Sequence, residues 1–144
     1  MRVLIIHGPN LNLLGERQPE IYGSQTLGEL NDFIRVSASE LGVVVEFAQY
    51  NGEGQIIDAI HDARESFDAI VINPGAYSHY SYAIADAIAS VPIPVVEAHL
   101  SNIANREAHR HVSVTAAACA GSVSGFGPHS YVIALQAALK IQGK

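Results

Sequence analysis

The prediction of this fold begins from the stretch Asp68-Ala-Ile-Val-Ile-Asn73-Pro74-Gly75-Ala76-Tyr77-Ser78-His79. Its first part, Asp68 to Ile72, is a short apolar run rich in β-branched residues, which is typical of a buried strand. Asn-Pro-Gly then ends the run, because proline lacks the amide hydrogen that a central strand needs and all three residue types favour turns. The stretch therefore predicts a buried strand that ends in a sharp polar turn.

The polar residues of this turn are candidates for a functional site. In open α/β sheets, ligands bind just beyond the carboxyl ends of the strands. The turn presents an amide at Asn73, a phenol at Tyr77 and an imidazole at His79 at such a position. A turn of purely structural use is the alternative interpretation, and the rest of the chain decides between the two.

A second strand and a long connection precede this stretch. Arg2 to His7 is an apolar run without alternation, as expected of a strand buried on both faces of a parallel sheet. The connection from Gly8 to Gly23 contains two prolines and three glycines. Because connections of this length in compact domains are usually functional, we expect it to be an active-site loop.

The remaining segments alternate between helical and extended patterns. Thr26 and Glu29 form a capping box that predicts the start of a helix, and Gly42 ends that helix. The other expected elements are a strand over Val43 to Ala48, a turn over Asn51 to Gly54, a helix from Ile56 to Phe67, a helix over Tyr82 to Ser90, a strand over Val95 to Ala98, a polar loop over Asn102 to Val112, a strand within Ala116 to Phe126, and a last helix opened by Gly127-Pro128.

Five strands alternating with helices predict an α/β fold with a doubly wound, five-stranded parallel sheet in a single domain over residues 1–144. We expect the flavodoxin-like strand order 2-1-3-4-5. In that order the first and third strands are neighbours at the switch point, so the Gly8 to Gly23 loop and the Asn73 turn would face each other across one crevice. His99, at the end of the fourth strand, would lie next to it.

Composition excludes several classes of protein. The net charge of -6 argues against a nucleic-acid partner, and Arg106 and Arg110 are the only clustered positive residues. The single cysteine, Cys119, excludes a disulfide framework and is expected to be a packed structural thiol. The apolar run Val3 to Ile6 is too short for a signal peptide or a membrane span, so we expect a cytoplasmic protein without membrane contact. A hydrophobic content of 49% against 15% charged residues indicates surface buried between subunits.

The expected crevice collects residues that can do chemistry. Glu97, His99 and Ser101 recur with period two, so an extended backbone points all three to one side. A tyrosine, two arginines, two histidines and two amides at one crevice supply a base, an acid and anion-binding donors. Taken singly, Tyr22 could pin its own loop, Arg17 could be a solvated charge, and His99 could be a core histidine bonded to Glu97. The full set is Asn10, Arg17, Tyr22, Asn73, His79, Glu97, His99, Ser101 and Arg110.

No cofactor is expected from these residues. Gly8-Pro9-Asn10 places a proline where a phosphate-binding loop needs backbone donors, so nucleotide binding is disfavoured. The seven histidines include no pair with helical metal-ligand spacing, so no metal is expected. Two rival functions remain: a flavodoxin-like module that binds FMN or another ligand without chemistry, and a metal-dependent hydrolase that uses the histidines.

Four motifs, in order and at unbroken spacing, resemble the signatures of type II 3-dehydroquinate dehydratase, and the resemblance covers essentially the whole chain. The chain departs from the usual family pattern at Ala85, at Ala104-Asn105 and at Ala108-His109, beside the functional positions. The motifs are Gly8-Pro9-Asn10-Leu11-Asn12-Leu13-Leu14-Gly15, Arg17-x-Pro19-x-x-Tyr22-Gly23, Asn73-Pro74-Gly75-Ala76-Tyr77-x-His79 and Glu97-x-His99-Leu100-Ser101-Asn102.

The resemblance implies a hydro-lyase of the shikimate or quinate pathway that converts 3-dehydroquinate into 3-dehydroshikimate by anti elimination through an enolate. By position, Tyr22 matches the base that removes the C2 proton, as a tyrosinate stabilised mainly by Arg17. His99 matches the acid that protonates the departing C1 hydroxyl, and Asn10 matches the amide that holds a water near the enolate. Glu97, on the same side as His99, can orient the imidazole and hold it protonated.

The resemblance also implies how substrate is held and how the protein assembles. Asn73, His79, the Leu100 backbone with Ser101, and Arg110 match the substrate-binding groups. The residue types agree, since a guanidinium suits the substrate carboxylate while amides and imidazole suit its hydroxyls. The family is a dodecamer of trimers, and Asp86 matches a residue that reaches into a neighbour's active site. A homo-oligomer without cofactor is therefore expected.

Overall fold

The computed structural model describes residues 1–143 and shows one five-stranded parallel sheet with the order β2-β1-β3-β4-β5. This confirms the predicted fold class and strand order. Every neighbouring pair of strands is parallel. The strands are β1 (Arg2–His7), β2 (Val44–Gln49), β3 (Ala69–Asn73), β4 (Val95–His99) and β5 (Gly121–Ser124).

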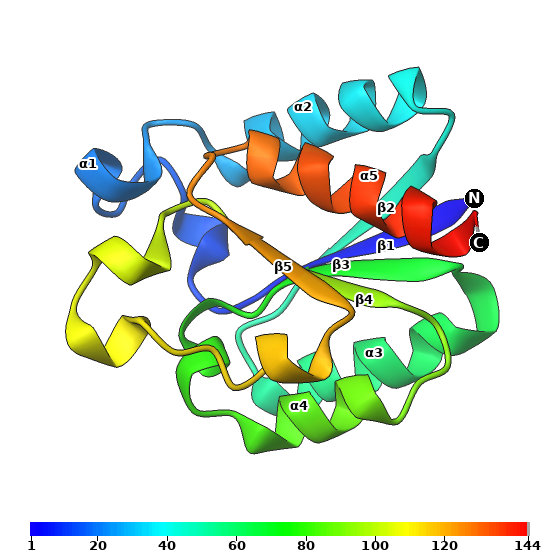
Figure 1. Cartoon of the computed structure of the whole chain (residues 1–144). Helices are drawn as coiled ribbons and strands as arrows, with labels where there is room; N and C mark the ends of the chain where they lie inside the picture. The colour runs from blue at the N-terminus through cyan, green and yellow to red at the C-terminus, as the bar shows by residue number, and fades with distance from the viewer. Residues whose placement is uncertain (144) are drawn as a thin grey trace.

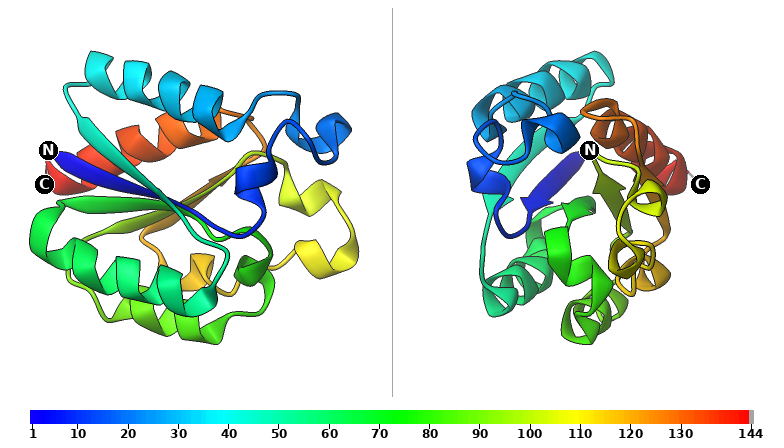
Figure 2. Two further views of the ribbon diagram at one scale, coloured as in Figure 1. Left: turned by 180° about the vertical axis from the view of Figure 1, so that it is seen from behind. Right: turned by 90° about the vertical axis from the view of Figure 1, so that its left-hand side faces the viewer.

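Four long helices cover the two faces of the sheet (Figure 1). α2 (Leu27–Glu40) and α5 (His129–Gln142) lie on one face, and α3 (Glu53–Ser66) and α4 (Tyr82–Ala89) lie on the other. Both views in Figure 2 show the same three layers, and the left view shows the termini at one end of the sheet and the irregular segments at the other. The helices therefore bury the sheet and leave the carboxyl ends of the strands to the loops.

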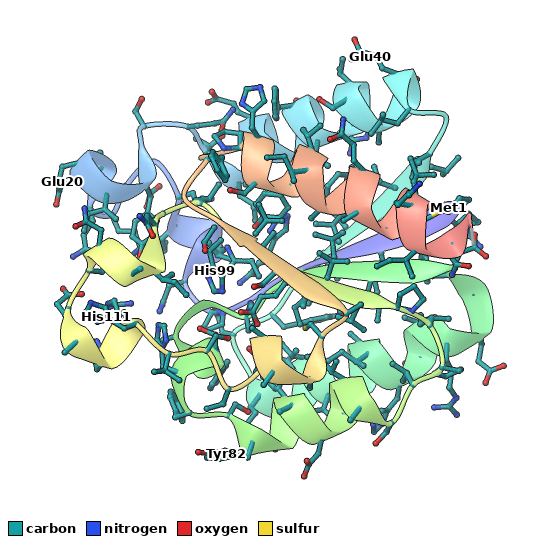
Figure 3. The ribbon with its side chains drawn as sticks, viewed as in Figure 1. Met1, Glu20, Glu40, Tyr82, His99 and His111 are labelled. Carbon is teal, nitrogen blue, oxygen red and sulfur yellow. The ribbon has the colours of Figure 1, made fainter. Side chains whose placement is uncertain are left out.

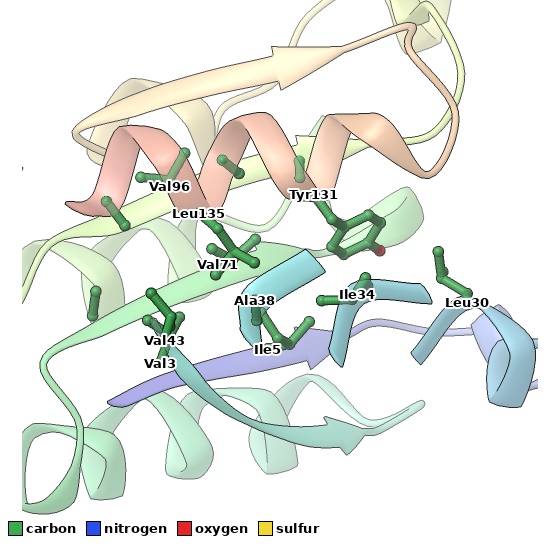
Figure 4. Packing of buried hydrophobic residues seen from close by; sticks show 14 of the residues in the cluster. Val3, Ile5, Leu30, Ile34, Ala38, Val43, Val71, Val96, Tyr131 and Leu135 are labelled. Carbon is green, nitrogen blue, oxygen red and sulfur yellow. The ribbon is translucent and has the colours of Figure 1, made fainter. Parts of the chain in front are cut away.

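Each face of the sheet has its own apolar core. Alternate residues of β1 divide between the two cores: Val3 and Ile5 pack toward α2 and α5, while Leu4 and Ile6 pack toward α3 and α4. Figure 4 shows the first of these cores, in which the ring of Tyr131 extends from α5 among apolar side chains. Fully burying one such aliphatic side chain stabilises a fold by about 1.5–3 kcal/mol, so the two cores together hold the central strands rigidly.

The switch point between β1 and β3 confirms the expected crevice. His7 pairs with Asn73 in the register of the two strands, and the Gly8 amide donates to the Asn73 carbonyl at 2.7 Å. A Cβ at Gly8 would lie 2.6 Å from the Pro74 backbone, so only glycine allows the two turns to approach this closely. The first connection and the Asn73 turn are thus held against each other.

The helix caps agree with the sequence pattern. The Thr26 hydroxyl accepts a 3.2 Å hydrogen bond from the Glu29 amide, as the capping box predicts. Ser81 caps α4 in the same way through the Ile84 amide, at 3.1 Å. Local hydrogen bonding at these two positions sets where each helix begins.

Two connections contain more structure than predicted. The Gly8 to Gly23 segment is not one loop: it forms a 3₁₀ turn at Leu11–Leu13 and the short helix α1 (Pro19–Tyr22), where proline occupies the first helical position. The Asn102 to Val112 loop contains two further 3₁₀ turns, Ile103–Asn105 and Ala108–Arg110.

The fifth strand covers only Gly121–Ser124, whereas Ala116–Ala118 is a 3₁₀ turn. Alanines carry little strand propensity, and Ser113 and Thr115, which precede this turn, bond through their side chains to Glu97 of β4. No helix within residues 1–143 is both long enough and apolar enough to cross a membrane.

Candidate active site

A cavity of about 120 Å³ lies at the carboxyl ends of β1, β3 and β4. The irregular segments gather at this end of the molecule, where Figure 3 labels His99 inside and Glu20 and His111 on the flanking segments. Nine of the predicted site residues line it: Asn10, Arg17, Tyr22, Asn73, His79, His99, Leu100, Ser101 and Arg110. Folding therefore brings together residues from four separate motifs.

Glu97 lies behind the cavity and holds His99 in place. The Glu97 side chain is fully buried, and its Oε2 atom lies 2.8 Å from Nε2 of His99. This contact uses one ring nitrogen and leaves Nδ1 of His99 available on its other side. The period-two pattern correctly predicted that Glu97 and His99 point the same way.

Two hydroxyls complete the surroundings of Glu97. Ser113 donates to Oε2 at 2.6 Å, and Thr115 donates to Oε1. With His99, three donors face one buried carboxylate, which is how a charge is accommodated in an apolar interior. Sequence reasoning missed Ser113 and Thr115, because their segment is short, irregular and far from Glu97 along the chain.

Tyr22 lies between two guanidinium groups. Arg17 stacks over the phenol, with its central carbon 4.9 Å from the ring centroid. Arg106 approaches the same ring and donates from Nη1 to the phenolic oxygen at 2.7 Å. Arg17 was expected to be the main partner of the Tyr22 oxygen; the structure instead places Arg106 at that oxygen and Arg17 on the ring face.

Arg106 also lines the cavity and is a further residue that sequence reasoning missed. Its side chain is 10% exposed, and Nη1 also lies 3.4 Å from the Ser101 hydroxyl. Its other terminal nitrogen, Nη2, is buried without a hydrogen-bond partner among residues 1–143. An unpaired buried guanidinium donor is costly, so this nitrogen is suited to an acceptor that enters the cavity. The clustering of Arg106 with Arg110 was the only signal in the sequence.

His79 and Arg110 form the other side of the cavity. Nδ1 of His79 lies 2.8 Å from the Val112 carbonyl and must carry its hydrogen there, so Nε2 is the free nitrogen. Burial lowers the pKa of His79 below its ordinary value, and Arg110 adds to this effect, so the ring is neutral at neutral pH. Arg110 lies 2.9 Å from Glu107 through Nε, at an angle that leaves this nitrogen without a hydrogen bond.

One predicted residue does not join this group. Asp86 is exposed on α4 and is not part of the cavity wall within a single chain. Figure 3 labels Tyr82, at the start of the same helix, on the outer surface of the molecule. Across residues 1–143, no group of three or more histidine, cysteine, aspartate or glutamate side chains is placed to hold a metal ion.

Comparison with known proteins identifies the family. Residues 1–139 match the family described as dehydroquinase class II. The chain belongs to the class II dehydroquinase family. The resemblance drawn from the four motifs is thereby confirmed.

Relatives of this class II dehydroquinase are similar over nearly their whole length. It is 57% identical over 136 residues to the 3-dehydroquinate dehydratase of Caldanaerobacter subterraneus subsp. tengcongensis, covering 94% of this chain and 92% of that protein. It is 58% identical over 141 residues to the 3-dehydroquinate dehydratase of Caldicellulosiruptor bescii, covering 97% of each. The crystal structure of type II dehydroquinase from Butyrivibrio crossotus superimposes with a TM-score of 0.94 at 46% identity, covering 96% of this chain and 97% of that one.

Proposed function

We propose that this class II dehydroquinase removes water from 3-dehydroquinate to give 3-dehydroshikimate, a step of the shikimate or quinate pathway. One observation carries the proposal: a tyrosine bonded to a guanidinium and a histidine bonded to a buried carboxylate line the same cavity. These pairs supply the base and the acid that an elimination needs. The names of the relatives point to the same substrate.

In the first step, Tyr22 acts as a phenolate and takes the proton from C2 of the substrate. The electron pair left behind moves into the C3 carbonyl and forms an enolate. The guanidinium of Arg106 favours the charged form of the phenol oxygen that it touches, and Arg17 adds positive charge at the ring face. Asn10 holds a water molecule near the developing enolate oxygen.

In the second step, the enolate collapses and the C1–oxygen bond breaks. His99, as the imidazolium, gives its Nδ1 proton to the departing hydroxyl, which leaves as water. Glu97 stabilises the cationic ring through Nε2. A proton then passes from Tyr22 back to His99, so that both groups return to their starting states.

The remaining polar residues of the cavity hold the substrate. Arg110, with its guanidinium at the rim, binds the substrate carboxylate. Asn73, His79 and Ser101, together with the backbone at Leu100, bind the hydroxyl groups through short directional bonds. The unpaired Nη2 of Arg106 is a further donor for an oxygen atom of the substrate.

We further propose that the chain acts as a dodecamer of trimers in which Asp86 completes the cavity of a neighbouring copy. Asp86 is exposed on α4 one helical turn after Tyr82, and Tyr80 and Tyr82 are 59% and 71% exposed. Exposed aromatic side chains of this size are typical of surfaces that become buried on association.

The reaction is tested by adding 3-dehydroquinate to the purified protein and following the ultraviolet absorbance of the conjugated enone product. We expect steady formation of the enone by the native chain and a rate near background for the Tyr22→Phe variant. A native chain that binds 3-dehydroquinate without producing the enone would contradict the proposal and favour a binding protein instead.

A further inference from the structure

A continuous chain of hydrogen bonds runs through the interior from α2 to the cavity. Oδ1 of Asn31 lies 2.8 Å from Nε2 of His7, and Nδ1 of His7 lies 3.1 Å from the Tyr131 hydroxyl. Nδ2 of Asn73 then donates to the Tyr131 oxygen at 3.2 Å. These four residues come from α2, β1, α5 and β3, and only Asn73 belongs to the cavity wall.

The direction of every bond in this chain follows from one backbone amide. The Gly75 N–H donates to Oδ1 of Asn73 at 3.1 Å, so the amide of Asn73 must present its nitrogen to Tyr131. The Tyr131 oxygen therefore accepts, and its own hydrogen must go to Nδ1 of His7. The other ring nitrogen of His7 then carries the hydrogen and donates to Asn31.

The protonation states agree with this direction. Burial lowers the pKa of His7 to about 4, so the ring is neutral and can accept at Nδ1. Burial also raises the pKa of Tyr131 above its ordinary value, so the phenol keeps its hydrogen. Both side chains are 0% exposed, and water cannot replace either partner.

We propose that Tyr131 and His7 are positioning residues that orient the Asn73 amide toward the substrate. Two points of attachment, the Gly75 N–H and the Tyr131 hydroxyl, fix the plane of the amide. The remaining N–H of Asn73 is then directed to one place before substrate arrives. Preorganised donors of this kind bind more strongly than donors that must reorient.

This inference rests on the proposed function, since it assigns Asn73 to substrate binding. Tyr131→Phe removes the hydroxyl and keeps the buried ring. We expect it to raise the KM for 3-dehydroquinate about fivefold to tenfold, the effect of one misplaced hydrogen bond, while kcat changes less than about twofold. Asn73→Ala should raise KM at least as much.

The decisive measurement is the double variant. If Tyr131 acts through Asn73, Tyr131→Phe adds nothing to KM in the Asn73→Ala background. A purely structural role of the hydroxyl would raise KM by the same factor in both backgrounds. Phe47→Leu is the matched control, because the Phe47 ring stacks on His7 at a centroid distance of 6.2 Å but takes no part in the series of hydrogen bonds. It should leave KM unchanged.

Each other outcome has a separate meaning. Additive effects on KM in the double variant overturn the positioning role and leave the proposed reaction standing. A native KM in Tyr131→Phe, when Asn73→Ala is impaired, has the same meaning. Native KM in Asn73→Ala overturns the role of Asn73 and the inference with it. Absence of enone formation by the native chain is instead a failure of the proposed function.

A second variant applies if Tyr131→Phe does not fold, as judged by thermal unfolding. Asn31→Leu removes the last acceptor, at the half-buried end of the series of hydrogen bonds. We expect a smaller rise in KM that again disappears in the Asn73→Ala background. A native KM for Asn31→Leu would then overturn the inference.

Discussion

Arg106 donates a 2.7 Å hydrogen bond to the phenolic oxygen of Tyr22, although 84 positions separate the two residues in the sequence. Arg17, which shares the Tyr22 segment, lies over the ring face instead. Both guanidinium groups lie against the ring, but only Arg106 bonds to its oxygen. Only the cation at the oxygen directly compensates the charge that forms there when the proton leaves.

Tyr22→Phe tests the base. Removing the phenol oxygen should lower kcat by about a thousandfold with little change in KM, since base catalysis contributes about 10²–10⁴ and no second base is placed to substitute. Steady-state kinetics of enone formation measures this. Tyr50→Phe, outside the cavity, is the control and should keep native kcat. If Tyr22→Phe retains more than about a tenth of native kcat, the base is another group, with His79 the next candidate.

Arg106→Gln and Arg17→Gln separate the two cations. We expect the Arg106 variant to lose about a hundredfold in kcat and the Arg17 variant to lose less, because only Arg106 bonds to the oxygen. The reverse ranking would make the ring-face contact the dominant one.

Thr115→Val tests the surroundings of Glu97. The substitution keeps the shape of the side chain but removes one of three donors to a buried carboxylate. A hydrogen bond to a charged group is worth about 1.5–3 kcal/mol, so the free energy of unfolding should fall by about that amount and kcat should fall with it. Urea unfolding and steady-state kinetics measure the two effects. Thr115→Ser, which keeps the hydroxyl, should restore both; a serine variant as impaired as valine would point to packing.

We expect the folded protein to lose stability at mildly acidic pH because of His7. Because burial lowers the pKa of His7 to about 4, the unfolded chain binds the proton more readily than the folded chain. The contribution of neutral His7 to stability is therefore fully present above the pKa of the unfolded chain, about 6.5. It is lost as the pH falls toward 4, by roughly 3 kcal/mol in total. Urea unfolding at pH values from 7 to 4 measures the slope.

The His7→Gln variant should flatten this pH dependence, because glutamine does not titrate in this range. His129→Gln, at an exposed position on α5, serves as the control and should keep the native slope. A native slope in His7→Gln would assign the loss of stability to other groups.

Assembly is tested by sedimentation at assay concentration. We expect the native chain to sediment as a large homo-oligomer, with Asp86→Ala lowering kcat/KM while leaving the oligomer intact. A fully active monomer would show that one chain contains the whole site. Asp58→Ala, on the other outer helix of the same face, is a matched control that should keep native activity.

The sequence alone determined the layered fold and most of the cavity. Uninterrupted β-branched runs such as Val3 to Ile6 predict strands buried on both faces, and alternation of strand and helix leaves few topologies. The switch-point rule then predicted that Asn10, Asn73 and His99 lie together. These predictions succeeded because they depend on short-range patterns and on general rules of chain connection.

Only the tertiary structure decided which side chains touch which. Arg106 reaches Tyr22, Thr115 reaches Glu97, and Tyr131 reaches Asn73, in each case from a segment distant in the sequence. No periodicity encodes such contacts, because they depend on how irregular loops and a helix face come to lie at the sheet edge. The sequence shows which side chains are available for the site. Long-range packing decides the partners that set the charge and the orientation of these side chains.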